Sequence, residues 1–250
     1  MNMTFGVGNV MGTGFRVWFR NLIPFLLITA IFYALPWLWA ASALNAEPTP
    51  ENLRHASIVF GVVSLLSVFL NAFVTAVLSY GVVMELHGQR ASIGACLATG
   101  LSRFLPALGV GILAGLATAG AFLLLIVPGF IVLCMLYVAT TVSVIERPGA
   151  MASLRRSREL TRGHKMEIFG IVVLIFVLEL VVSLVLGGVV TSPGATTEAA
   201  FVTMRHQLYL TVGQQVVFGS LNAVMASVAY VFLRFEKEGT SAAELAAIFD

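Results

Sequence analysis

The sequence predicts an all-α fold, a polytopic membrane bundle of six transmembrane helices with amphipathic interfacial helices on its cytoplasmic side. Three observations predict it. The chain of 250 residues is 59% hydrophobic and only 10% charged, whereas soluble domains carry about 25% charged residues. Its apolar residues gather in stretches long enough to cross a hydrocarbon core of about 30 Å, which takes about 20 helical residues. Its positive charges fall almost entirely on one side of those stretches.

The first 21 residues are moderately apolar and end near two arginines, Arg16 and Arg20. Apolar side chains recur there at loose helical spacing, which predicts an amphipathic helix lying in the membrane interface. A signal peptide is the alternative, because small residues resembling a cleavage site follow the next apolar stretch. That stretch, residues 22–44, is longer than the 7–15 or so apolar residues of a signal peptide, which favours an uncleaved first span.

The middle of the chain contains an apolar stretch that is too long for one crossing. Residues 58–83 predict the second span, and apolar side chains at three- and four-residue intervals predict an interfacial helix over 91–104. From Phe104 to Ile145 the chain stays apolar, a length of about 63 Å as a helix. Proline ends a helix and glycine permits a reversal, so Pro128 and Gly129 are predicted to break it. The six predicted spans are residues 22–44, 58–83, 104–126, 130–145, 167–190 and 209–233.

The long charged run at residues 146–169 is predicted to be the largest cytoplasmic loop. With six spans, only Arg54 and Arg205 of the fourteen Lys and Arg residues fall outside. Cytoplasmic loops are enriched in Lys and Arg, so both termini are predicted to be cytoplasmic, with a short amphipathic helix in the tail, residues 236–250. The loop is expected to contact anionic phospholipid headgroups or a membrane-protein partner rather than nucleic acid. The residues expected to make this contact are Arg155, Arg156, Arg158, Arg162 and Lys165.

Glu179 lies in the middle of the predicted fifth span, where an acid costs about 2.5–3.5 kcal/mol on insertion scales. It should therefore face the interior of the bundle. Centring each span at one depth places five polar residues level with it or one turn away: Tyr33, Asn71, Tyr137, Ser183 and Asn222. This predicted cluster has two interpretations. It forms interhelical hydrogen bonds that stabilise the bundle, or it serves a proton relay or a substrate contact.

The sequence carries no recognisable pattern of an enzyme or metal site. Its four histidines lie in four different loops or boundaries without metal-ligand spacing. It has no phosphate-binding loop, nucleophile elbow or zinc-protease motif. We therefore expect no cofactor, no metal and no enzymatic activity. Cys96 and Cys134 are predicted to lie at different depths, so a disulfide is not expected.

Four short segments resemble a broad group of bacterial six-span membrane proteins. That group includes the YciC-like proteins and the membrane domain attached to some glycerophosphoryl diester phosphodiesterases. The segments are Ile126–Phe130, Val144–Glu146, Leu154–Gly163 and Tyr230–Gly239. The resemblance implies a helical bundle in the bacterial inner membrane. It implies no phosphodiesterase activity, which belongs to a separate soluble barrel, and it carries over no catalytic residues.

Two functions from different classes follow from these patterns. The first is a non-enzymatic scaffold, accessory or lipid-associated protein of the inner membrane that uses its basic cytoplasmic face. The alternative is a small transporter or channel that uses the polar cluster around Glu179. A continuous polar cavity reaching Glu179 would favour the alternative, and a dry, closed core would argue against it.

Overall fold

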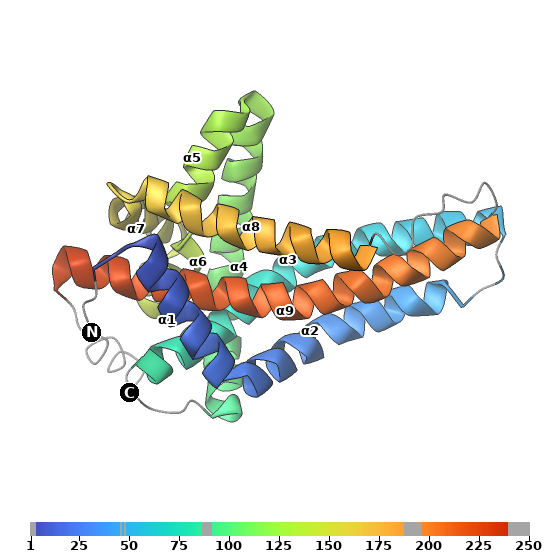
Figure 1. Ribbon diagram of the computed structural model, residues 1–250, viewed down its shortest axis with the longest axis horizontal. Coiled ribbons are helices and arrows are strands. Elements are labelled where there is room, and N and C mark those ends of the chain that lie inside the picture. Colours follow the sequence, from blue (N-terminus) through green and yellow to red (C-terminus); the bar gives the residue numbers. More distant parts are fainter. Residues whose placement is uncertain (1–3, 46, 48, 87–91, 188–196, 240–250) are drawn as a thin grey trace.

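The computed structural model describes residues 4–45, 47, 49–86, 92–187 and 197–239, and every regular element among them is a helix. This confirms the all-α prediction. Figure 1 colours the helices in chain order. Their bounds are α1 Val7–Arg20, α2 Leu22–Ala43, α3 Pro50–Leu86, α4 Ile93–Leu124, α5 Ile126–Leu136, α6 Ala139–Ile145, α7 Ala150–Thr161, α8 Lys165–Gly187 and α9 Thr197–Glu238.

Four long helices, α2, α3, α8 and α9, run along the long axis of the molecule (Figure 1). α9 is mostly buried among its neighbours, whereas α4 and α8 are mostly exposed. One core joins α9 to α1, α2 and α3, and its fully buried side chains include Tyr33, Leu78, Met225 and Tyr230. α9 is therefore the central helix, against which the others pack.

α1 packs one face on α9, although the sequence predicted only an interfacial position for it. It is bent by 82° from the first part of α2. The buried residues on its packed face are Val10, Gly14, Val17 and Trp18. Gly14 permits a close approach to α9, because a Cβ at this position would overlap the sulfur of Met225. Trp18 Nε1 donates a hydrogen bond of 2.9 Å to Ser220 Oγ, which fixes the register between the two helices.

α4 and α5 form a hairpin that stands crosswise to the long helices (Figure 1). The chain reverses at Leu125, whose backbone is extended (φ −160°, ψ 150°). Pro128 and Gly129, where the sequence placed the break, instead lie in the first turn of α5. Proline is tolerated there because first-turn N–H groups have no partner within a helix. Gly129 allows the two helices to approach, since a Cβ would overlap the Phe122 ring.

Several helices differ in extent from the predicted elements. α4 is one continuous helix that includes most of the predicted interfacial helix and most of the predicted third span. α3 and α9 begin before residues 58 and 209, where the spans were predicted to start. A turn at residues 137–138 divides the fourth predicted span into α5 and α6. The predicted tail helix beyond Gly239 and residues 188–190 of the fifth predicted span lie outside the described residues.

Five helices of the described chain are long and apolar enough to cross a membrane. They are α3, α4, α5 together with α6, α8 and α9. α1 and the first part of α2 make a sixth candidate when the bent pair is taken as one span. The count of five to six agrees with a multi-pass membrane protein. The side on which the termini lie stays a prediction.

Reporters fused to the two ends of the chain are expected to report the same compartment, because six crossings return the chain to its starting side. A cysteine introduced at Glu47, between α2 and α3, is expected to react with a membrane-impermeant thiol reagent from the opposite side. Cys96 and Cys134 are free but buried, so replacing both gives a clean background. Opposite locations of the two ends would overturn the predicted topology.

Candidate functional site

α3 carries a polar face along its first half. Three exposed polar side chains recur every seven residues: Ser57, Ser64 and Asn71. Seven residues make about two helical turns, so all three side chains share one face of the helix. This polar face is about 21 Å long at a rise of 1.5 Å per residue.

α9 carries a matching polar face. α3 and α9 pack side by side and begin at the same end of the bundle (Figure 1). On α9 the polar residues recur at helical intervals, with Gln207 and Asn222 exposed and Thr211, Gln214 and Gln215 half-buried between them. Two neighbouring helices therefore present hydrogen-bonding groups along stretches that are otherwise apolar.

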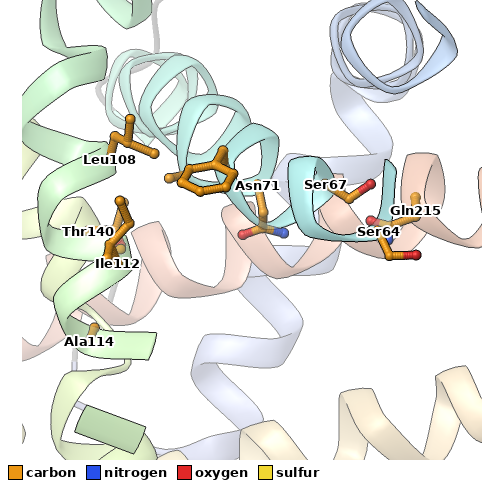
Figure 2. A pocket seen from close by; sticks show the side chains of 11 residues that line it. Ser64, Ser67, Asn71, Leu108, Ile112, Ala114, Thr140 and Gln215 are labelled. Carbon is orange, nitrogen blue, oxygen red and sulfur yellow. The ribbon is translucent and has the colours of Figure 1, made fainter. Parts of the chain in front are cut away.

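α8 completes a polar cavity of about 160 Å³ with these two faces. Its lining residues are Asn71, Glu179, Thr211, Gln214, Gln215, Phe218, Gly219 and Asn222. A second cavity of about 360 Å³ shares Asn71 and Gln215 with the first. It runs past Ser64 and Ser67 and continues between α3 and α4 to Thr140 (Figure 2). We call these two cavities together the polar groove.

Three of the six residues of the predicted polar cluster line this groove. Glu179, Asn71 and Asn222 line the same cavity, although they come from α8, α3 and α9. The Tyr137 hydroxyl donates a hydrogen bond of 3.4 Å to Asn222 Oδ1. Tyr33 lies behind the lining, with its ring against Gly219. Ser183 is exposed on α8, one turn from Glu179, and does not line either cavity.

Sequence reasoning missed six further lining residues: Ser64, Ser67, Thr140, Thr211, Gln214 and Gln215. The three on α9 were overlooked because that span was predicted to begin at residue 209, which places them near its end. The seven-residue spacing of Ser57, Ser64 and Asn71 could have revealed the polar face of α3.

The polar groove opens sideways out of the bundle. Asn71, Glu179 and Asn222 all remain exposed. Beyond Ile175, every described residue of α8 with a placed side chain is exposed except Val182, which is half-buried. The second half of α8 therefore stands away from its neighbours. A carboxyl and two amides consequently face the surroundings at the depth where the sequence predicts the middle of the bilayer.

Apolar cavities adjoin the polar groove at both ends. One, of about 290 Å³, lies between α8 and α9 and shares Gln214 and Phe218 with the polar cavity at Glu179. The other, of about 460 Å³, lies between α4 and α5 and shares Ala114 with the larger polar cavity. The lining thus changes from apolar to polar and back to apolar.

A separate ion cluster joins α7 to the last turn of α9. Glu146, after α6, accepts hydrogen bonds from Arg156 Nε at 3.0 Å and from the Tyr230 hydroxyl at 2.8 Å. Arg234 Nε lies 3.1 Å from Glu238 Oε2, and Arg156 also pairs with Glu238. Although partial burial lowers the pKa of Arg156, its hydrogen bonds to both carboxylates outweigh that effect and raise the pKa. We call these five residues the α7–α9 ion cluster.

The basic residues predicted to contact lipid divide into two sets. Arg156 points into the α7–α9 ion cluster, with its side chain 24% exposed, and Lys165 is half-buried at the start of α8. Arg155 and Arg158 are exposed three residues apart on one face of α7, and Arg162 is exposed directly after the helix, where the backbone is extended. Of the five residues predicted to contact lipid, these three are therefore the exposed ones.

Groups that suit metal binding or acid–base chemistry are sparse in the described part of the chain. No three His, Cys, Asp or Glu side chains among the described residues lie close enough together to hold a metal ion. His164 Nε2 lies 3.5 Å from Glu236, and its Nδ1 lies 3.9 Å from Glu167. These three residues lie at the start of α8 and the end of α9, outside the lining of the polar groove. Glu179 is the one carboxyl among the residues that line the groove.

The model of one protein family matches residues 6–233, which is most of the chain and includes every residue of the polar groove. The chain belongs to the DUF7847 family. DUF7847 is described as a domain of unknown function. In this DUF7847 chain the match ends just before Arg234, so part of the α7–α9 ion cluster lies beyond it. No curated protein and no solved structure matches the chain. The resemblance to the YciC-like and phosphodiesterase-associated membrane proteins stays a prediction.

Proposed function

We propose that this protein is a non-enzymatic, lipid-associated component of the bacterial inner membrane that binds the polar headgroup of a lipid in its polar groove. The observation that carries the proposal is the sideways opening of the groove, with Asn71, Glu179 and Asn222 exposed along it. A membrane lipid can enter such a groove from the bilayer without passing through the bundle.

The exposure of these side chains argues against a purely structural role. Polar residues that stabilise a membrane bundle point between helices and bond to one another. An unpaired polar group in hydrocarbon costs several kcal/mol. Glu179 lines an open cavity of about 160 Å³, where water or the polar group of a ligand can satisfy its carboxyl. Lipid headgroups line both surfaces of the membrane, and one of them reaches this depth by moving inward along the groove.

The basic face of α7 supports a position beside an anionic membrane surface. Arg155 and Arg158 are exposed on one face of α7 and Arg162 directly after it, and each basic residue near an anionic leaflet contributes about 1 kcal/mol to membrane association. Met151 lies one turn before Arg155 on α7 and is 72% exposed, which provides an apolar contact beside the charges. In this proposal, the face holds the cytoplasmic end against anionic phospholipids.

Transport of the bound lipid is the second candidate function. The polar faces of α3 and α9 do not stop at Glu179, because Ser57 and Gln207 continue them toward the end where both helices begin. A polar track open to the bilayer would let a headgroup move along the bundle while its chains stay in the hydrocarbon. The polar groove would then be one of several binding positions along the transport route.

Native mass spectrometry of protein extracted gently from its own membranes tests the proposal. The wild-type protein is expected to retain a lipid. Asn222→Leu, which removes a lining amide, is expected to reduce the retained fraction about tenfold, because an unpaired polar group on the lipid costs about 1–3 kcal/mol.

Ser183→Val is the matched control, since Ser183 lies one turn from Glu179 but outside the lining. It should retain lipid like the wild type and keep the wild-type Tm in detergent, whereas Asn222→Leu, which also removes the acceptor of the Tyr137 hydroxyl, should lower the Tm slightly. Equal lipid retention by Asn222→Leu and Ser183→Val would sink the proposal. A fluorescent-lipid exchange assay in vesicles then distinguishes binding alone from transport.

A further inference from the structure

The charge of the lining restricts which headgroup the polar groove accepts. Its polar members are one carboxyl, the four amides of Asn71, Gln214, Gln215 and Asn222, and hydroxyls. None of the lining residues is Lys, Arg or His. The nearest arginine along α9, Arg205, donates a hydrogen bond of 2.9 Å to the Leu44 carbonyl, and His206 beside it is half-buried and outside the lining of both cavities.

A phosphate is a poor ligand for such a lining. Phosphate oxygens only accept hydrogen bonds, and proteins bind them with Arg, Lys or rows of backbone N–H groups. The backbone N–H groups of α3, α8 and α9 at the groove lie inside helices, where carbonyls of the same helix occupy them. A phosphate beside Glu179 would also place two acids together in a medium of low dielectric constant.

Hydroxyl groups complement the same lining well. Each amide offers two N–H donors and a carbonyl acceptor, and a carboxyl accepts at both oxygens when ionised. A hydroxyl both donates and accepts, so a ring of hydroxyls can satisfy amides and carboxyl together without bringing any charge. Resting on the proposed function, we infer that the ligand is a glycolipid: a lipid whose headgroup is an uncharged sugar without phosphate.

The cavity at Glu179 is smaller than one turn of a helix of another membrane protein and suits a small headgroup. One turn of a helix with its side chains is about 10 Å wide and 5.4 Å high, which makes roughly 400 Å³. The cavity at Glu179 is about 160 Å³, room for about five water molecules at 30 Å³ each. That volume suits a single sugar ring, and the adjoining cavity of about 360 Å³ accommodates its linkage.

The apolar cavities provide a place for the lipid chains. The cavity lined by Val182, Leu186 and Val217 adjoins the polar cavity directly through Gln214 and Phe218. A diacylglycerol unit in that position would be covered on one side by α8 and α9 and would face the bilayer on the other. The sugar headgroup would then contact the polar cavity, and the acyl chains would contact the apolar cavity beside it.

Binding of three lipids with identical acyl chains tests the inference: glucosyl diacylglycerol, phosphatidylglycerol and diacylglycerol. Delipidated full-length protein in detergent is titrated with each and scored by native mass spectrometry. Glucosyl diacylglycerol is expected to bind at least about tenfold more tightly than either of the others, and Asn222→Leu is expected to remove that advantage. Gln215→Leu serves as a second variant if Asn222→Leu does not fold.

Two variants that change the charge at Glu179 are expected to change the lipid preference in a defined direction. Glu179→Gln is expected to keep glucosyl diacylglycerol binding within about threefold, because the amide still bonds to hydroxyls, and to strengthen phosphatidylglycerol binding by removing an acid. Glu179→Lys is expected to reverse the preference in favour of phosphatidylglycerol.

The failures of the two proposals are distinguishable. If phosphatidylglycerol binds the wild type as tightly as the glycolipid, and Asn222→Leu abolishes both, the sugar inference is overturned while lipid binding in the groove stands. If no lipid binding responds to Asn222→Leu or Gln215→Leu, the proposed function itself fails. Photocrosslinking from position 71 to a membrane protein instead of a lipid would also overturn both.

Discussion

Replacing Glu146 with alanine is expected to lower the free energy of unfolding by about 2–3 kcal/mol. Glu146 accepts hydrogen bonds from Arg156 and Tyr230 and lies 3.7 Å from Arg234 Nη1. Its loss leaves two guanidinium groups in a partly buried site with fewer partners. Breaking a fully buried pair costs about 3–5 kcal/mol, but side-chain exposures of 24% for Arg156 and 17% for Arg234 let water solvate part of the freed charge.

The measurement is the unfolding midpoint in a mild detergent, followed by amide hydrogen exchange on α7. Glu159→Ala is the matched control, because Glu159 is an exposed carboxylate on α7, and a change there should stay within about 0.5 kcal/mol. Glu146→Gln should lie between the two, since an amide oxygen still accepts from Tyr230. If Glu146→Ala and Glu159→Ala have equal midpoints, the α7–α9 ion cluster contributes nothing to stability.

The cluster also explains why the predicted basic surface is smaller than the sequence suggested. Nothing in the run Arg155, Arg156, Arg158 distinguishes one arginine from the next. Arg156 points inward because the turn before α7 brings Glu146 within reach, and because Glu238 arrives from a helix 82 residues further along the chain. Such a pairing depends on tertiary structure and leaves no local signal in the sequence.

The helices themselves were predictable because a bilayer demands long apolar helices. Their ends were less so. The stretch before Ser57 was assigned to a loop for its charges, yet it opens α3 with Pro50 in the first turn and Glu51 beside it, and Thr49 Oγ1 accepts from Asn52 N at 3.2 Å. Proline and an acid in a first turn are a helix-start pattern. The predicted start of the second span at residue 58 did not take this helix-start pattern into account, because the residues around it are polar.

The position of each polar residue within its predicted span was enough to predict part of the polar groove. Asn71, Glu179 and Asn222 were selected because each lies near the middle of its predicted span, and one cavity joins them. The crosswise position of α4 and α5, which forms the far wall of the groove at Leu108 and Ile112, was not predictable from composition. Apolar residues fit a helix along the bundle as well as one across it. The direction of α4 is therefore set by its packing against α3.

Gly100 is where α4 approaches α3 very closely, and Gly100→Ala is expected to destabilise the protein by about 1–3 kcal/mol. A Cβ at this position would overlap Val77 Cγ2 and lie 3.0 Å from Val77 Cα, so backbone as well as side chain must move. Gly109→Ala, where no atom lies within 4 Å of the new Cβ, should instead be neutral or gain up to about 1 kcal/mol from helix propensity. Val77→Ala should rescue Gly100→Ala in part, since it removes the overlapping methyl but leaves the backbone of α3 equally near.

Because α4 also walls the polar groove, Gly100→Ala should release bound lipid as well as lower the Tm. Equal midpoints for the two alanine variants would show that the crossing of α3 and α4 is looser than these distances require.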